Sequence, residues 1–234
     1  MLAAVLYRLR VVYERIHDTR FISHLDLTNA FNRALRRTDA PVAFTEGFSP
    51  RPRTAFGPPL PLFVEGEGEL ADIELTERVD ADALIARINE VLPAGIRLLS
   101  GRYVPMKVPS ITAAILQATY RVEVKEGDWS VTPEKVADLL ARTEVQITKE
   151  SKGQKKVVDI RPAILSLRLE GSSILHAQVE ASPVRTLNVF DLMGALEPGF
   201  TAATSARFRV VRAGFVLQEL PETAAARVDQ LAAT

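Results

Sequence analysis

The chain opens with an alternating pattern of apolar and charged positions. Between residues 6 and 16, the apolar residues Leu9, Val11 and Tyr13 recur at every second position, and the charged residues Arg8, Arg10 and Glu14 fall at the positions between or beside them. This repeat of two predicts a β-strand. A helical pattern follows. Ser23 is a candidate N-cap with Asp26 three positions later, and the next apolar residues recur at helical spacing: Leu27, Phe31, Ala34 and Leu35. The pattern therefore predicts a strand followed by a helix that buries one stripe.

The helical pattern ends at a long segment that is rich in proline. Residues 47–61 hold five prolines and two glycines, which is too many for regular structure, so a stiff loop is expected there. After it come a predicted strand, a helix and a second strand, at residues 69–75, 80–92 and 95–104. The predicted order of elements in the first part of the chain is therefore strand, helix, one or two strands, helix and strand.

A similar order recurs after a linker. Thr132 and Pro133 have the residue types of an N-cap and a first helical position, and Asn188 begins a second, shorter helix. Strands are predicted around these helices at residues 119–125, 144–150, 157–169, 173–180 and 207–217. The repeated order predicts an α+β protein of two tandem ferredoxin-like (split βαβ) domains. The expected boundaries are 1–104 for the first domain, 105–117 for the linker, 118–220 for the second domain and 221–234 for a tail.

Composition excludes several kinds of chemistry. The 234 residues include no cysteine, so disulfides, thiolate metal sites, cysteine nucleophiles and cysteine-ligated iron–sulfur clusters are ruled out. No apolar run approaches the roughly 20 residues that cross a bilayer, and residues 1–7 carry no export signal. We therefore expect a cytoplasmic protein without a membrane partner, with no metal site and with no cofactor of its own.

Charge is unevenly distributed although the formal net charge is +0. Residues 8–61 contain nine arginines and five acidic residues, a balance of +4, whereas residues 62–90 contain nine acidic residues and two arginines, a balance of −7. The first block is a candidate for binding an anion, and the second is a candidate for docking a protein partner.

Polar residues concentrate at the start of the first helix and in the proline-rich loop. A helix N-terminus favours an anion, and arginines on one helix face or in a neighbouring loop strengthen that preference. The candidate residues for binding a phosphate or an RNA backbone are Arg20, His24, Arg33, Arg37, Arg51 and Arg53. The alternative interpretation is a capped helix with a solvated basic face. His24 itself fits a general acid or base, or a capping or packing residue.

A second basic segment lies in the other half of the chain. Residues 149–156 hold four lysines around Gly153, which resembles the tip of a basic hairpin. Such a tip can follow phosphates, and it is equally a common way to solvate a hairpin. Its candidate contact residues are Lys152, Lys155 and Lys156.

Several of these segments resemble the radical-SAM-linked protein family. The resemblance rests on residues 20–27 (Arg-Phe-Ile-Ser-His-Leu-Asp-Leu), 33–37, 46–53 (Glu-Gly-Phe-Ser-Pro-Arg-Pro-Arg) and 60–62, with further similarity at 92–95 and 156–162. In that family the domain stands alone or is fused behind a cobalamin-binding radical SAM region. The resemblance implies an accessory or substrate-presenting subunit, because the reactive cofactor would belong to the partner.

Three functions remain open. The leading hypothesis is a non-catalytic accessory subunit that binds or presents RNA, with no catalytic residues of its own. The second is a protein–protein adaptor, in which the acidic block at 65–82 and the proline-rich loop dock a cobalamin-binding radical SAM partner. The third is a metal-independent endoribonuclease that uses His24. It follows from a loose likeness to doubled ferredoxin-like nucleases that bind CRISPR RNA, although residues 213–215 are a poor version of their glycine-rich loop.

Overall fold

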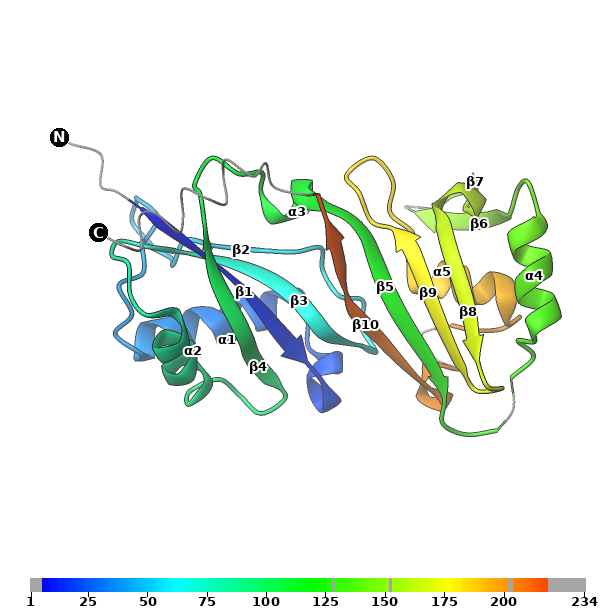
Figure 1. The fold of residues 1–234 in the computed structure, drawn as a ribbon, viewed down its shortest axis with the longest axis horizontal. Helices are drawn as coiled ribbons and strands as arrows, with labels where there is room; N and C mark the ends of the chain where they lie inside the picture. Colours follow the sequence, from blue (N-terminus) through cyan, green and yellow to red (C-terminus); the bar gives the residue numbers. More distant parts are fainter. Residues whose placement is uncertain (1–5, 128, 152, 202–203, 219–234) are drawn as a thin grey trace. The chain divides into compact units, whose positions relative to one another are not determined.

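The structure is a computed structural model that describes residues 6–127, 129–151, 153–201 and 204–218 (Figure 1). It is an α+β protein with mainly antiparallel sheets and few helices, as the sequence predicts. The described chain forms two compact units. The first comprises residues 6–62 and 66–114 with Gln218, and the second comprises residues 63–65 and 115–217. The division falls inside the segment predicted as a linker, 105–117, which contains a short helix and the start of a strand. The predicted tail, 221–234, lies outside the described residues.

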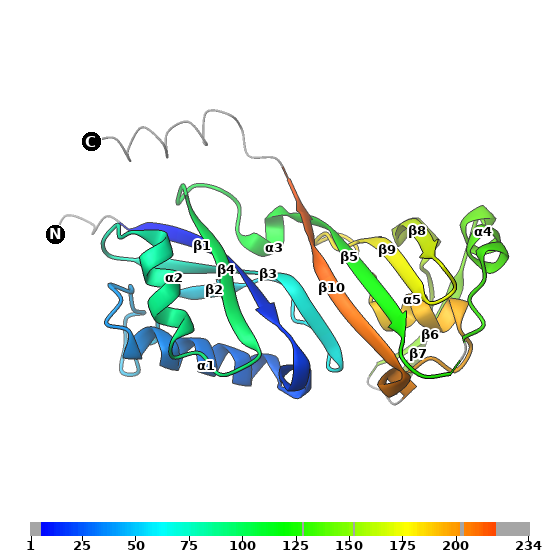
Figure 2. The same cartoon turned by 60° about the horizontal axis from the view of Figure 1, so that its bottom comes forward.

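The first unit contains the elements β1 (Tyr7–Arg15), η1 (His17–Phe21), α1 (His24–Arg37), β2 (Thr54–Phe56), β3 (Val64–Leu75), α2 (Ala81–Asn89), β4 (Ile96–Val104) and α3 (Ile111–Ala114), except that the first two residues of β3 belong to the second unit. Its strands lie in the order β4-β1-β3, with β2 paired to β3, and every pair is antiparallel (Figures 1 and 2). β2 corrects the expectation that residues 47–61 are loop throughout, because residues 54–56 pair with β3 between two groups of prolines.

Both long helices of this unit pack on one face of its sheet. Alternate residues of β1, including Leu9 and Val11, share one apolar cluster with Phe31 of α1 and with Leu84 and Ile88 of α2. The predicted stripe of α1 is confirmed, since Leu27, Phe31, Ala34 and Leu35 are all buried. The opposite face of the sheet consequently carries the other strand residues, among them Arg8 and Arg10.

The second unit contains β5 (Ile115–Val124), α4 (Pro133–Ala141), β6 (Gln146–Ser151), β7 (Gln154–Asp159), η2 (Arg161–Ala163), β8 (Ile164–Glu170), β9 (Ile174–Glu180), α5 (Val189–Leu196), η3 (Thr204–Arg207) and β10 (Phe208–Leu217). Its main strands lie in the order β10-β5-β9-β8 and are antiparallel, while β6 and β7 form a separate hairpin. Both predicted caps are present: the Thr132 side chain accepts from the Lys135 amide, and the Asn188 side chain accepts from the Phe190 amide.

One strand prediction in this unit is wrong. The expected strand at residues 157–169 is broken by η2, which contains Pro162, so that β7 and β8 belong to different sheets. Proline has no N–H to donate and fixes its own φ angle, which interrupts a ladder. The single run of apolar residues therefore serves two separate strands.

Candidate nucleic-acid interface

The start of α1 is closed by a capping box. Ser23 Oγ accepts a hydrogen bond from the Asp26 amide at 3.1 Å, and the Asp26 carboxylate accepts from the Ser23 amide at 3.3 Å and from its hydroxyl at 2.7 Å. These bonds, with a smaller effect of Arg33, hold the pKa of Asp26 below its usual range. The predicted N-cap is thus confirmed. In this capping box the Asp26 carboxylate already occupies the position that a bound anion would take at the helix N-terminus.

His24 lies in the first turn of α1 against an aromatic ring. The ring is half-buried and stands edge-to-face on Phe56, with 5.6 Å between ring centroids. Burial lowers the pKa of His24, and the positive charge of the buried Arg15 lowers it further. The imidazole is therefore neutral at neutral pH, so His24 offers hydrogen bonds and a ring surface and brings no positive charge to an anion.

The candidate arginines around α1 fall at its two ends. Arg20 belongs to η1, ahead of the helix, and its guanidinium lies 4.8 Å from the centre of the Phe21 ring. Arg33 and Arg37 are exposed, near or in the last turn, and Arg36 lies beside them. A helix of 14 residues is roughly 20 Å long. The structure consequently brings Arg33 and Arg37 together on one face and leaves Arg20 and His24 at the other end.

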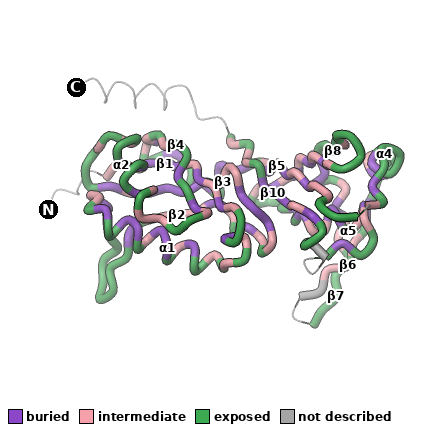
Figure 3. The backbone as a smooth tube through the Cα atoms, turned by 90° about the horizontal axis from the view of Figure 1, so that it is seen from below, coloured by how far each residue is buried: buried purple, intermediate pink, exposed green. Residues whose placement is uncertain are grey.

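An exposed loop joins the C-terminal end of α1. Residues 44–51 are exposed throughout (Figure 3). The Phe48 side chain at the tip is fully exposed. The loop closes on itself, because the Thr45 amide donates to the Arg51 carbonyl at 2.9 Å and the Arg51 amide donates to Thr45 Oγ1 at 3.1 Å. Arg51 thereby lies at the base of a short, closed loop.

Arg36 attaches this loop to the helix. Its Nη2 donates to the Pro50 carbonyl at 2.6 Å, and its guanidinium lies 5.5 Å from the centre of the Phe44 ring. Arg36 was not among the candidate residues predicted from the sequence. Its only sequence signal was its place between two exposed arginine positions, and the bond to Pro50 depends on how the loop folds back.

Arg53 belongs to a different group of side chains. Its Nε lies 2.8 Å from Glu74 Oε2 of β3, and its side chain is 45% exposed. Arg51 and Arg53 were expected to converge on one anionic partner. They are two positions apart, but one lies at the base of the exposed loop and the other pairs with a carboxylate on the sheet.

The basic hairpin is formed by β6 and β7 in the second unit. Lys155 and Lys156 are exposed, Lys149 is the cross-strand partner of Lys156, and Lys152 lies outside the described residues. Lys149 forms an ion pair with Asp191 of α5 at 2.6 Å. The hairpin therefore presents Lys155 and Lys156 to solvent while Lys149 is attached to the neighbouring helix.

The segment after this hairpin has a structural role. Asp159 Oδ1 accepts from the backbone amides of Val145 and Arg161, and the Arg161 side chain donates to the carbonyls of Leu140, Arg142 and Ile164. Arg161 thus satisfies carbonyls at the end of α4, which otherwise lack partners. Its interactions account for the Asp-Ile-Arg-Pro sequence at 159–162 without a ligand.

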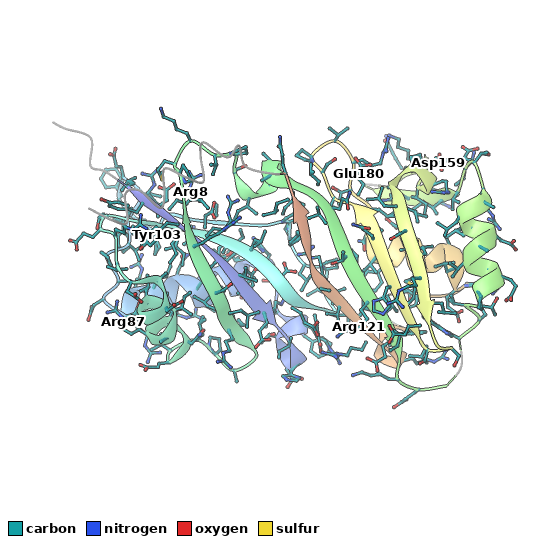
Figure 4. The ribbon with its side chains drawn as sticks, in the orientation of Figure 1. Arg8, Arg87, Tyr103, Arg121, Asp159 and Glu180 are labelled. Atoms are coloured by element: carbon teal, nitrogen blue, oxygen red, sulfur yellow. The ribbon has the colours of Figure 1, made fainter. Side chains whose placement is uncertain are left out.

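One polar cluster was missed from the sequence. His176 Nε2 lies 2.8 Å from Glu170 Oε2, and Arg168 Nη2 lies 3.1 Å from the same oxygen. Hydrogen bonds from His176 and then from Arg168 lower the pKa of Glu170. The signal was the hairpin register: Arg168 pairs with His176 across β8 and β9, which places Glu170 on the same face. The cross-strand partner of His176 on β5 is Arg121, which is labelled in Figure 4.

Within the described residues, no group of three or more His, Cys, Asp or Glu side chains is arranged to hold a metal ion. No helix among the described ranges has the length and apolar character needed to span a bilayer.

Comparison with known families adds one finding. A family model described as "Uncharacterized protein conserved in bacteria (DUF2344)" matches residues 8–189. The chain belongs to this family. The match includes α1, the loop at 44–51 and the β6–β7 hairpin, so every candidate residue discussed above lies inside the family region. Among curated proteins, no match to the chain is found.

Proposed function

We propose that this protein is a non-catalytic accessory subunit of a radical SAM enzyme and that it binds RNA through one surface of its first unit. We call this the arginine–loop surface and define it by the exposed side chains of Arg33, Arg36, Arg37, Arg51, Phe44 and Phe48. The observation that carries the proposal is the bond from Arg36 to the Pro50 carbonyl, because it joins the basic end of α1 to the exposed loop.

The chemistry of this surface suits a single-stranded nucleic acid. Four guanidinium groups can each donate two hydrogen bonds to a phosphate, and the loop carries two exposed aromatic rings on which bases can stack. The carboxylates nearest in sequence, Asp39 and Glu46, leave the group with a net positive charge. The loop is closed and held before any ligand arrives, so binding loses less ordering entropy than it would with an open loop.

The enzyme partner is supported by the family resemblance and by composition. The segments that resemble radical-SAM-linked proteins include residues 33–37 and 46–53, which hold every residue of the arginine–loop surface except Phe44. A chain without cysteine has no thiolate ligands for an iron–sulfur cluster, so the radical chemistry would belong to a cobalamin-binding partner.

The adaptor alternative is weakened by burial. It requires the acidic block at 65–82 to face a partner protein, yet Glu65, Glu69 and Asp72 are all buried. Three other acidic residues of the block, Glu77, Asp80 and Asp82, are exposed. They and the exposed Phe48, which a hydrophobic pocket on another protein would accept, are what the adaptor alternative retains for docking. The nuclease alternative keeps a neutral His24 as its candidate base, and it predicts cleavage of RNA in the presence of a chelator.

The test is binding of a fluorescent single-stranded RNA oligonucleotide at several salt concentrations. The triple variant Arg33→Ala/Arg37→Ala/Arg51→Ala should bind more weakly by about 1–3 kcal/mol, and the salt slope should flatten by about 2 because three phosphate contacts are lost. The control is Arg97→Ala/Arg142→Ala, which removes two exposed arginines outside the surface. Equal affinity and slope in wild type and the triple variant would exclude RNA binding here and favour the adaptor.

We also propose that each unit is a ferredoxin-like split βαβ domain. The support is that both units have two helices between four strands and the same spatial order: β4-β1-β3-β2 in the first and β10-β5-β9-β8 in the second. In both, the strand after the second helix lies beside the first strand. Cross-strand NMR contacts between β5 and β9, and between β1 and β3, would test this arrangement.

A further inference from the structure

In the first unit, the sheet face opposite α1 and α2 borders a cavity that is lined by none of the six residues of the arginine–loop surface. Its volume is about 350 Å³, which is at the small end of the range for ligand pockets. Residues from β1, β2, β3, the loop before β2 and the segment before α3 line it, and the charged ones are Arg8, Arg53, Asp72 and Glu74. Arg8 is labelled in Figure 4.

Most of the charge around this cavity is paired. Beneath it, Arg10 makes two bonds to Asp72, from Nε to Oδ1 at 2.8 Å and from Nη2 to Oδ2 at 3.0 Å. The exposed fractions of these side chains are only 3% and 4%. At the rim, Arg53 pairs with Glu74 at 2.8 Å. Two guanidinium groups are therefore matched by the two carboxylates.

Arg8 is the third guanidinium, and it leaves the cluster with a charge of +1. Its side chain is 15% exposed, and its contacts are long: 3.5 Å from Nη1 to the Val108 carbonyl, 3.6 Å from Nη2 to Glu74 and 3.9 Å from Nε to Asp72. A strong bond from a guanidinium to a carboxylate measures about 2.7–2.9 Å. Arg8 is thus a largely buried cation that lines a cavity and makes no short bond with any residue that the structure describes.

We propose that this cavity binds a small organic monocarboxylate, whose carboxylate pairs with Arg8. A monocarboxylate neutralises the surplus charge and can accept two bonds from one guanidinium, which offsets the cost of a buried cation. Thr54 and Ser110, which carry hydroxyl groups, line the same space, and Pro52, Ala55 and Val108 offer apolar surface for the carbon part of the ligand.

The nearby carboxylates select against more highly charged ligands. Asp72 and Glu74 lie within 4 Å of Arg8, so a phosphate dianion would meet two like charges at close range. A monocarboxylate brings half that charge. The cavity adjoins the arginine–loop surface at Thr45, which lines the cavity and accepts a hydrogen bond from the Arg51 amide, but none of the six residues that define that surface lines it. Loss or retention of RNA binding in the triple variant therefore leaves the carboxylate proposal to its own test.

The experiment is an NMR titration of the ¹⁵N-labelled full chain with sodium acetate and sodium benzoate, and with sodium phosphate and sodium chloride at matched ionic strength. Saturable shifts are expected for the amides of Thr54, Ala55 and Val108 with acetate or benzoate, and weaker ones with phosphate. Arg8→Met should weaken carboxylate binding about tenfold or more. Arg8→Lys, which retains the charge but loses the paired donors, should fall between Arg8→Met and wild type.

Three outcomes would overturn the proposal. The first is the absence of saturable shifts at the cavity with either carboxylate, and the second is an unchanged affinity in Arg8→Met. The third is tighter binding of phosphate, or of an RNA oligonucleotide, at these same amides. If Arg8→Met does not fold, the proposal is tested with Thr54→Val, which removes a hydroxyl from a residue that lines the cavity and leaves every charge in place. This variant should bind acetate and benzoate several-fold more weakly than wild type, and an unchanged affinity would overturn the proposal.

Discussion

Arg36 donates a hydrogen bond from Nη2 to the carbonyl oxygen of Pro50 across 2.6 Å, and so joins the last turn of α1 to the loop at 44–51. The same guanidinium lies near the face of Phe44. Its neighbour Arg37 is also exposed but makes no such bond to the loop among the described contacts. The two arginines therefore form a natural pair of variants, equal in charge and different in their effect on the loop.

Arg36→Ala is expected to loosen the loop, whereas Arg37→Ala is not. Losing a bond of about 1 kcal/mol should raise the population of the open loop about fivefold. Phe48 at the tip is a site for chymotrypsin, so cleavage after Phe48 should accelerate by that factor in Arg36→Ala and stay at the wild-type rate in Arg37→Ala. Equal cleavage rates in the two variants would show that the bond does not hold the loop.

The buried pair of Arg10 and Asp72 leads to a prediction about stability. Arg10→Met leaves the Asp72 carboxylate buried without its two short bonds, which should cost about 3–5 kcal/mol. Arg10→Met/Asp72→Leu removes both charges and should recover most of that loss. Hydrogen exchange of peptides from β1 and β3 measures the change within the first unit itself.

Arg53→Ala is the matched control for this pair. Its ion pair with Glu74 is as short as the one between Arg10 and Asp72, but the Arg53 side chain is 45% exposed, compared with 3% for Arg10. Its removal should cost less than about 1 kcal/mol. A loss of similar size in Arg10→Met and Arg53→Ala would contradict the role given to burial.

Local signals in the sequence predicted the first helix well. The cap by Ser23, its partner Asp26 and the buried stripe that ends at Leu35 all depend on residues within one or two turns of each other. The break at Pro162 also had a local signal, because proline rarely lies inside a strand. These features depend on the spacing of residue types over a few positions, and that spacing can be read from a single sequence.

The long-range pairs could not be predicted in this way. Alternation along β1 placed Arg10 on the polar side of its strand, and it does lie there, but its partner Asp72 is 62 residues away and the pair is buried. The Pro109 carbonyl also accepts from Arg10, so a segment nearly 100 residues distant covers that side of the strand. Which polar face of a sheet is covered depends on tertiary packing, which periodicity does not encode.

The candidate site was predicted in part for the same reason. Arg33 and Arg37 share a helix face, as their spacing requires, whereas the contact of Arg36 with Pro50 and the pairing of Arg53 with Glu74 depend on the path of the loop. His176 and Glu170 meet only because the register of β8 and β9 puts them on one face.

His24 gives a prediction about pH. Burial and Arg15 lower its pKa from the ordinary value of 6.5, so the unfolded chain binds this proton more readily than the folded chain. Stability should therefore fall as pH drops through 6.5 toward the folded-state pKa. His24→Phe keeps a ring against Phe56 and removes the titration, so its melting temperature should fall less than that of wild type over this interval. An NMR titration that gives His24 a pKa at or above 6.5 would contradict the account.

The last prediction concerns Gly95, which lies between α2 and β4 in the segment 92–95. Its φ angle is +85°, which disfavours residues with a Cβ, and its carbonyl accepts from the amide of Ile16 and from the hydroxyl of Thr19. A Cβ at this position would lie 2.7 Å from the Ile16 carbonyl oxygen and 2.8 Å from Thr19 Cγ2. Gly95→Ala must therefore bear both backbone strain and a steric clash with the chain that leads into η1.

Gly199 separates these two effects, because its φ angle is also +85° but a Cβ there would meet nothing within 4 Å. Gly199→Ala should cost only the backbone strain, about 1 kcal/mol, whereas Gly95→Ala should cost about 2–3 kcal/mol. Since the two glycines belong to different units, each variant is measured by hydrogen exchange in its own unit: β1 and β4 for Gly95, β10 and α5 for Gly199. Equal losses in the two variants would mean that the contact with Ile16 and Thr19 adds nothing beyond the φ angle, and that the segment yields to admit the methyl group.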